Sequence, residues 1–286
     1  MKISIITPNY NYAKYIAQTI ESVVTQDYEN IEHIIVDDGS TDNSVEIIKN
    51  YQEKYPGKIK LIKQENRGQT PAINVGLKAA TGDIIGWINS DDYYCPSIFS
   101  KIIDIFIKNN NIDILYGNVN VVDKKGLFIF RKRNLNYNFL ECCFSGFANC
   151  FTSNSFFWRK DCITQNELLN ESFKCNMDGE FISRIVIGKN IFFLDEPLAN
   201  FRKQDFTITS QRFSNWNIIV KKEIEYELRN SYQRLKISKI VPYNYNQIIK
   251  YIFRFKRIIK RIIKLHYLYE YIEKKKYNKS KNCNCY

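Results

Sequence analysis

The stretch Gly86-Trp87-Ile88-Asn89-Ser90-Asp91-Asp92 places two neighbouring carboxylates directly after an apolar run. Residues 83–88 read as a buried strand, so Asp91 and Asp92 follow its carboxyl end. Like charges this close repel unless a cation or strong hydrogen-bond donors offset them. The pair therefore predicts a divalent metal that bridges protein to phosphate. A helix N-terminus, where Asp is common, is the alternative interpretation.

Strands and helices alternate along the chain before this pair. Apolar runs at residues 3–7, 31–36 and 59–62 predict strands, and each is followed by a turn and a segment of helical periodicity. This alternation predicts an α/β fold built from parallel β-α-β units with right-handed crossovers. Ligands of such sheets bind beyond the carboxyl ends of the strands, where both acidic motifs of the chain are expected.

Three segments in this order resemble motifs of the family 2 glycosyltransferases, and the resemblance covers roughly residues 1–210. The segments are Ile5-Ile6-Thr7-Pro8-Asn9-Tyr10-Asn11, Val36-Asp37-Asp38-Gly39-Ser40-Thr41-Asp42 and Asn89-Ser90-Asp91-Asp92. Each motif alone is weak, but the order and spacing of all three are specific. The resemblance implies a GT-A fold, a nucleotide-binding β-α-β sandwich with a mixed central sheet. It also implies inverting transfer of a sugar from a nucleoside-diphosphate sugar to an acceptor hydroxyl.

The resemblance assigns residues to the sugar donor. Asp37 and Asp38 match the motif that holds the nucleotide base and ribose. Asn89, Asp91 and Asp92 match the motif that holds the ribose and a divalent metal, Mg²⁺ or Mn²⁺, on the diphosphate. Asp91 and Asp92 are the predicted metal ligands, and Asn89 is a predicted substrate contact.

Further donor contacts are expected from two other segments. Pro8 and Asn9 belong to the first of the three motifs and are predicted to bind the donor. The loop that contains Asn66 and Gly68 lies between the two acidic motifs in the sequence. This position predicts that the loop forms a wall for the sugar and phosphates.

Two residues depart from the family pattern. Asn89 stands where the family usually has Asp, so it can hydrogen-bond a ribose hydroxyl but adds no charge to the ion. Gln204 stands where relatives often have His in a Tyr-Arg-x-His segment, and an amide oxygen suits hard cations better than transition metals. Arg202 in the same segment, Phe201 to Thr209, is predicted to neutralise phosphate, with a solvated basic surface as the alternative.

The catalytic base is expected well downstream, because an inverting transfer needs a group that takes the proton from the acceptor hydroxyl. Asn176-Met177-Asp178-Gly179-Glu180-Phe181 precedes a segment with helical spacing, so it predicts a helix start. By resemblance, Asp178 occupies the position of the base. Glu180 is the competing candidate, and a purely structural role for both as helix N-terminal charges is the alternative.

The positive charge of the chain belongs to its C-terminal part. Residues 1–210 contain 23 Lys and Arg against 25 Asp and Glu, a net charge of −2, whereas residues 211–286 contain 19 against 5, a net charge of +14. We therefore expect a GT-A domain at 1–210 and a helical basic extension with a frayed end at 211–286. The acidic balance of the first part argues against nucleic acid as a partner.

The extension contains a predicted amphipathic helix. Its basic face is formed by Lys250, Arg254, Arg257, Arg261 and Lys264, and its apolar face by Ile248, Ile252, Phe255, Ile259 and Ile262. This pattern predicts binding to an anionic membrane surface through residues 245–273. Packing on the catalytic domain and nucleic-acid binding are the alternatives.

Two features bear on location. No run of about 20 apolar residues is free of charge, so no membrane-spanning helix is expected. A short strand and a Pro-Asn turn follow Lys2 in place of a signal peptide. These features predict a cytoplasmic protein, peripheral on the cytoplasmic membrane face, with a nucleotide sugar as donor. The acceptor is a glycan, a lipid-linked molecule or a protein.

Two rival functions remain open. A nucleotide-sugar-binding protein without catalysis is the first, because Asn89 and Gln204 depart from the family pattern. A nucleic-acid-binding module is the second and rests only on the basic extension. Acceptor choice is expected to depend on residues 115–175, whose aromatic side chains either stack on a sugar or belong to the core. These side chains are Tyr116, Phe144, Phe147, Phe156, Phe157 and Trp158.

Overall fold

The structure is a computed structural model that describes residues 1–138, 141–142, 150–164, 167–173, 175–204, 222–223, 226 and 246–283. For 246–250 and 281–283 it describes the backbone alone. The predicted boundary at residue 210 therefore lies outside the described residues, as do Phe144, Phe147 and the segment from Asp205 to Thr209.

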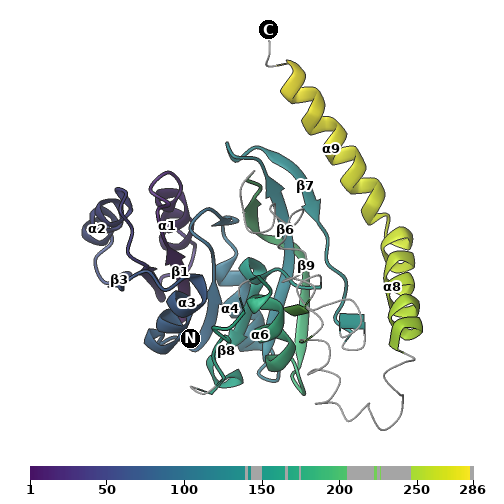
Figure 1. Ribbon diagram of the computed structural model, residues 1–286, viewed down its shortest axis with the longest axis horizontal. Coiled ribbons are helices and arrows are strands. Elements are labelled where there is room, and N and C mark those ends of the chain that lie inside the picture. The colour runs from purple at the N-terminus through teal and green to yellow at the C-terminus, as the bar shows by residue number, and fades with distance from the viewer. Residues whose placement is uncertain are drawn as a thin grey trace.

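A mixed sheet forms the centre of the molecule (Figure 1). Its strands are β1 (Ile3–Asn9), β2 (Ile31–Asp37), β3 (Ile59–Lys63), β4 (Ile84–Trp87), β5 (Tyr93–Tyr94), β6 (Ile114–Val122), β7 (Phe128–Lys132), β8 (Phe156–Arg159) and β9 (Ile191–Arg202). They are ordered β3-β2-β1-β4-β8-β6-β9-β5, and β7 pairs with β6. The strands β1 to β4 are mutually parallel, as the alternation of strands and helices predicts, whereas β8 runs antiparallel to β4.

Helices cover both faces of this sheet. They are α1 (Ile16–Val24), α2 (Ser44–Lys54), α3 (Gln69–Ala79), α4 (Phe99–Lys108) and α6 (Met177–Ile185). Neighbouring residues of β1 face opposite clusters, with Ile6 packed beside Ile73 of α3 and Ile5 packed beside Phe99 of α4. Burial on both faces explains why the strands read as continuous apolar runs instead of alternating ones.

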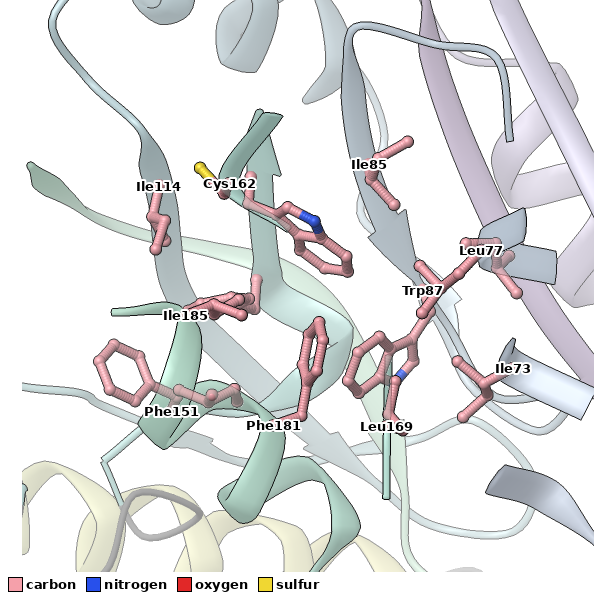
Figure 2. Close-up of a cluster of buried hydrophobic side chains, with 14 of the residues drawn as sticks. Ile73, Leu77, Ile85, Trp87, Ile114, Phe151, Cys162, Leu169, Phe181 and Ile185 are labelled. Carbon is pink, nitrogen blue, oxygen red and sulfur yellow. The ribbon is translucent and has the colours of Figure 1, made fainter. Parts of the chain in front are cut away.

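The helix α6 is fixed against β4 by aromatic side chains (Figure 2). Phe181 of α6 lies 5.6 Å, between ring centroids, from both Trp87 of β4 and Trp158 of β8. The two tryptophan rings meet edge to face at 5.7 Å. The start of α6 is thereby held near the strand that leads to the acidic pair.

Two C-terminal helices, α8 (Asn246–Ile263) and α9 (His266–Cys283), lie along the β7 side of the sheet, and α9 extends beyond it (Figure 1). Arg133, which follows β7, pairs with Glu273 of α9 at 2.7 Å. This pair places α9 against the β7 side of the sheet, while packing of the amphipathic segment as a core helix stays a prediction. Among the described helices, none is long and apolar enough to span a membrane.

Candidate active site

The ends of β1 and β2 bring the first acidic motif next to Asn9. The parallel register pairs Asn9 with Asp37. Asn9 Nδ2 donates to Asp37 Oδ1 at 2.8 Å, and the backbone N–H of Ser40 donates to Asp37 Oδ2 at 3.1 Å. Asn9 Oδ1 is buried and has no hydrogen-bond partner among the described residues. This orphan acceptor is available to an N–H group of a ligand.

Asp38 holds the loop that follows β3. Its Oδ1 accepts from the backbone N–H of Arg67 at 2.9 Å, and its Oδ2 accepts from that of Gly68 at 2.7 Å. Gly39 has φ +77°, and a Cβ there would lie 3.1 Å from the backbone N of Asn66, so a close approach requires glycine. The Asn66 side chain is exposed. The predicted wall loop is thus fastened to the first acidic motif.

The start of α3 connects the same loop to the second motif and to α6. Gln69 Nε2 donates to Asn89 Oδ1 at 2.8 Å. Thr70 Oγ1 donates to Met177 Sδ at 2.8 Å. Since Met177 immediately precedes Asp178, these contacts gather the loop, Asn89 and the start of α6 in one region.

Asp92 is buried by its surroundings. Its Oδ1 accepts the backbone N–H of Arg202 at 2.8 Å, and its Oδ2 accepts Asn154 Nδ2 at 3.2 Å. Burial and the neighbouring charge of Asp91 raise the pKa of Asp92 well above its usual value. Asp92 therefore organises β9 and the segment before β8.

Asp91 is less enclosed than Asp92, with 8% exposure against 1%. Gln204 Nε2 donates to Asp91 Oδ2 at 2.6 Å, and no side chain among the described residues donates to the other oxygen. Burial raises the pKa of Asp91, while the hydrogen bond from Gln204 and the charge of Arg202 oppose the rise. The strand β5 directly follows the pair, so the interpretation of the pair as a helix N-terminus is wrong.

Arg202 is buried beneath the acidic pair. Its Nε donates to the Asp91 carbonyl oxygen at 2.9 Å, and its Nη2 donates to Gln18 Oε1 at 2.6 Å. Its guanidinium lies 4.7 Å from the ring centroid of Tyr15 and 5.4 Å from that of Tyr93. At 2% exposure the solvated basic surface is wrong for Arg202, and these contacts favour a positioning role. Phosphate binding by Arg202 stays a prediction.

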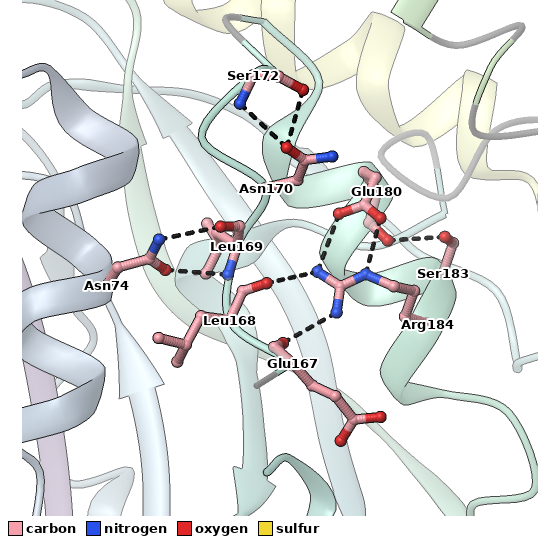
Figure 3. A network of polar contacts seen from close by, with 9 residues as sticks. All are labelled: Asn74, Glu167, Leu168, Leu169, Asn170, Ser172, Glu180, Ser183 and Arg184. Carbon is pink, nitrogen blue, oxygen red and sulfur yellow. Dashed lines mark hydrogen bonds and ion pairs between the residues drawn. The ribbon is translucent and has the colours of Figure 1, made fainter. Parts of the chain in front are cut away.

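The two candidate bases differ in their contacts. Glu180 is bound on both oxygens by Arg184, at 2.7 Å from Nε and 3.0 Å from Nη2 (Figure 3). Arg184 also donates to the carbonyl oxygen of Leu168 at 2.7 Å. Glu180 is therefore part of a structural network, whereas Asp178 is half-buried in the first turn of α6. The engagement of both Glu180 oxygens by Arg184 argues against Glu180 as the base, and Asp178 stays a prediction.

Sequence reasoning did not find Asn154, Tyr12 and Lys132. Asn154 reaches Asp92 from a loop 62 residues away in the sequence. Burial, together with the charges of Asp91 and Asp92, raises the pKa of Tyr12 to about 12. Burial lowers the pKa of Lys132, and the charge of Asp178 opposes that shift. No motif marks these residues, since they come from separate loops and strands.

Most of the aromatic side chains considered for acceptor stacking are core residues. Those that the structure describes are Tyr116, Phe156, Phe157 and Trp158, each with at most 1% exposure. Their burial leaves no face open to a sugar ring. The side chains of the described aromatic set therefore stabilise the sheet.

Residues 4–173 match the sequence pattern of Glycosyl transferase family 2. The chain belongs to this family. An uncharacterised glycosyltransferase of Nostoc sp. is 43% identical over 130 residues, which are 43% of this chain and 40% of that protein. The minor teichoic acid biosynthesis protein GgaA of Bacillus subtilis is 28% identical over 251 residues, 84% of this chain and 55% of GgaA. The family 2 chain thus spans about half or less of the length of these two relatives.

Solved structures share the fold. S. aureus TarS 1–349 in complex with UDP-GlcNAc has a TM-score of 0.60 at 22% identity, over 86% of this chain and 77% of that one. The mannosyltransferase PcManGT from Pyrobaculum calidifontis, in complex with GDP-Man and Mn²⁺, has a TM-score of 0.57 at 15% identity, over 87% and 68%. The predicted GT-A fold with its mixed sheet is confirmed for this member of family 2.

Proposed function

We propose that this protein transfers a sugar from a nucleoside-diphosphate sugar to an acceptor hydroxyl with inversion at the anomeric carbon. One observation carries the proposal: Asn9 and Asp37 are hydrogen-bonded at the carboxyl ends of the parallel strands β1 and β2, and Asp91 follows the carboxyl end of the neighbouring parallel strand β4. This edge is where α/β sheets bind nucleotides. Relatives that were solved with UDP-GlcNAc and with GDP-Man support a nucleotide sugar as donor and leave its base open.

The nucleoside is proposed to lie against the first acidic motif. Asn9 Oδ1 is the buried acceptor that is left for an N–H of the base. Asp37 of β2 is hydrogen-bonded to Asn9, and Pro8 precedes Asn9 in β1. The loop of Asn66 and Gly68 would form the wall toward the ribose and phosphates, and Asn89 would contact the ribose.

The residues present fit a divalent cation held mainly by Asp91. The protein typically supplies one or two carboxylates to Mg²⁺, and substrate phosphates and water complete its shell. Asp91 is the more accessible carboxylate of the pair, whereas both oxygens of Asp92 already accept hydrogen bonds. Across the described parts of the chain, no group of three or more His, Cys, Asp and Glu side chains could hold a metal. A bound Mg²⁺ or Mn²⁺ would neutralise charge on the departing diphosphate.

Asp178 is proposed to take the proton from the acceptor hydroxyl as that oxygen attacks the anomeric carbon. The acceptor is a glycan, a lipid-linked molecule or a protein. Asp178 is proposed only to remove the proton from an acceptor hydroxyl that is already positioned. Substitution of Asp178 should therefore lower turnover without changing donor affinity.

Asp178→Asn tests the base, with Glu180→Gln as the matched carboxylate-to-amide variant two residues along the same helix. We expect donor affinity to be unchanged in Asp178→Asn and turnover to fall by about 10²-fold or more. Glu180→Gln should keep turnover per folded molecule and lower thermal stability, because Arg184 loses its partner. Loss of turnover in Glu180→Gln alone would transfer the role to Glu180.

The reaction itself is tested with a panel of nucleotide sugars and Mg²⁺ or Mn²⁺. Thermal shift identifies the donor, since a ligand that binds only the folded state raises its stability. Product analysis by NMR then reads the anomeric configuration. Retention of configuration would contradict the mechanism. Binding without turnover on any acceptor would favour a nucleotide-sugar-binding protein instead.

A further inference from the structure

The helices α8 and α9 turn a polar seam toward the rest of the protein. Tyr277 donates to Asp123 Oδ2 at 2.8 Å, and Arg257 donates to Cys150 Sγ at 2.9 Å. Lys260 pairs with Glu141, which is 4% exposed. Together with the pair between Arg133 and Glu273, these contacts fix which side of each helix faces outward.

The side that remains is apolar and exposed. We define the tail surface by its exposed large side chains: Tyr251, Ile252, Phe255, Ile258, Ile259, Ile262, Ile263, Leu265, Tyr267, Leu268, Tyr269, Tyr271 and Ile272. Phe255 is 63% exposed and Ile263 is 73% exposed. The described body of the protein exposes few large apolar residues by comparison, such as Ile107 and Leu127. Exposed large apolar side chains gathered on two successive helices in this number mark a candidate binding surface.

The charges around the tail surface have one sign. Within residues 251–280 the only acidic residues are Glu270 and Glu273, and both are paired with arginines, Arg261 and Arg133. The exposed charged side chains there are all cations: Lys260 pairs with Glu141, and the others are Arg254, Lys256, Lys264, Lys274, Lys275, Lys276 and Lys279. The surface is therefore complementary to a partner that is both anionic and apolar.

A shallow hollow on α9 adds a local binding feature. It has a volume of about 440 Å³ and is lined by Tyr271, Lys274, Lys275, Asn278 and Lys279. Lysine ammonium groups bind phosphate as point charges. The hollow is thus suited to an anionic headgroup.

We propose that the tail surface docks α8 and α9 in the plane of an anionic membrane, with the apolar side chains among the acyl chains and the lysines at the headgroups. Helices that lie at membrane interfaces combine these two residue classes. A second copy of this chain fits less well, because a two-fold interface would place the cations of both copies against each other. Nucleic acid would match the charge but leave Ile, Leu and Phe side chains without an apolar partner. The proposal does not depend on the sugar-transfer chemistry.

Sedimentation of the full chain with vesicles tests the proposal. Vesicles of phosphatidylcholine alone are compared with vesicles that contain phosphatidylglycerol. We expect binding to the anionic vesicles, weakened by high salt because surface attraction is screened within about 10 Å at 0.1 M ionic strength. No sedimentation with either vesicle would overturn the proposal.

Two variants separate the apolar and the charged contributions. Replacing Phe255, Ile262 and Ile263 together with Gln should reduce vesicle binding on the order of tenfold or more, since each side chain loses its apolar partner. Replacing Lys264, Lys275 and Lys276 with Gln should reduce binding to anionic vesicles and remove part of its salt dependence.

Matched controls carry the same changes elsewhere. Ile107→Gln with Leu127→Gln and Phe192→Gln removes three exposed apolar groups outside the tail surface, and replacement of Lys60, Lys63 and Lys78 with Gln removes the same charge. These controls should bind as the wild type does, and equal loss in the controls would overturn the proposal. Analytical ultracentrifugation tests for a second copy, because a dimer that the triple variant of Phe255, Ile262 and Ile263 dissociates would assign the surface to a dimer interface. Binding of the protein to RNA in place of vesicles would assign the surface to nucleic acid.

Discussion

The two carboxylates of the acidic pair have different surroundings, and we expect them to have different functions. Asp91 is the more accessible carboxylate, while Asp92 is enclosed by the backbone of Arg202 and the side chain of Asn154. Sequence alone treats the two as equivalent, because adjacent identical residues carry no sign of which oxygen is already satisfied. The hydrogen bonds make them distinguishable by substitution.

Asp91→Asn and Asp92→Asn should therefore differ. Asp91→Asn should abolish metal-dependent donor binding and leave thermal stability equal or higher, since burial disfavours the Asp91 charge. Burial disfavours the Asp92 charge as well, but Asp92→Asn should still cost about 1–3 kcal/mol of stability, because its new amide N–H groups would face the donor groups of Asn154 and Asn89. Calorimetric titration of the donor with and without Mn²⁺, together with thermal unfolding in the absence of metal, measures both effects. Equal behaviour of the two variants would contradict the division.

The buried histidine His33 predicts a pH dependence of stability. His33 in β2 is 0% exposed, and its Nε2 lies 2.8 Å from Thr7 Oγ1. Burial lowers the pKa of His33 from 6.5 to about 3. The unfolded chain thus binds a proton at this site below about pH 6.5 and the folded chain does not, so stability falls as pH falls through that window.

The contribution of His33 can be measured by comparing how the unfolding free energy changes with pH in the wild type and in His33→Gln. Between pH 7 and pH 5 the wild type should lose about 2 kcal/mol more of its unfolding free energy than His33→Gln, at about 1.4 kcal/mol per unit below the unfolded pKa. Urea unfolding at each pH gives both values. Parallel pH profiles for the two proteins would show that another group is responsible.

Among the elements, β4 links the centre of the sheet to the acidic pair. It pairs with β1 on one side and β8 on the other, and its carboxyl end leads into Asn89 and the acidic pair. Gly86 in β4 lies opposite Phe157 of β8. A Cβ at Gly86 would lie 2.8 Å from Phe157 Cδ1 and 2.9 Å from Cε1. Phe157 is 0% exposed, so its ring has no solvent into which it could move.

Gly86→Ala should therefore destabilise the protein by about 1–3 kcal/mol, the usual cost of overpacking a core. Donor affinity should fall as well, since the strand that delivers Asp91 has to shift. Chemical unfolding and donor titration give the two quantities. The double variant Gly86→Ala with Phe157→Leu should recover part of the loss relative to Phe157→Leu alone. A strictly additive double variant would exclude the clash as the cause.

For the whole molecule, the position of the C-terminal helices depends on a small number of polar contacts with β7 and its neighbours. Glu273 accepts from both terminal nitrogens of Arg133 and from the backbone N–H of Arg131 at 2.8 Å. The two side chains are 16% and 20% exposed. Such partly buried, bidentate contacts contribute more than exposed pairs do.

Glu273→Gln should accordingly loosen α9 without unfolding the sheet. Hydrogen exchange of amides in α9 and β7 should become faster, whereas β1 and β2 should keep their protection. Asp104→Asn is the matched control, because its pair with Lys108 is 60% and 74% exposed and should contribute little. Unchanged exchange in Glu273→Gln, or faster exchange throughout the sheet, would contradict this account of how the tail is held.

The sequence by itself determined the family, the alternating strands and helices of the first half, and the strand-end location of Asp37, Asp38, Asp91 and Asp92. These features depend on local periodicity and on motif spacing, which the chain carries in linear form. The amphipathic character of the C-terminal segment could be predicted for the same reason.

Only the tertiary structure decided which atoms of the site residues are already hydrogen-bonded within the protein. In the structure Arg184 donates to Glu180, and Asn154 donates to Asp92. Arg202 donates to the backbone carbonyl oxygen of Asp91. On the predicted basic face, Arg257 donates to Cys150 and Arg261 pairs with Glu270, whereas the apolar face is exposed. The physical reason is that the partners of Asp92, Arg202 and Arg257 come from distant strands and loops, which neither periodicity nor spacing encodes. The Glu180–Arg184 pair spans only four residues of α6, but the carbonyl oxygen of Leu168 that fixes Arg184 comes from another segment.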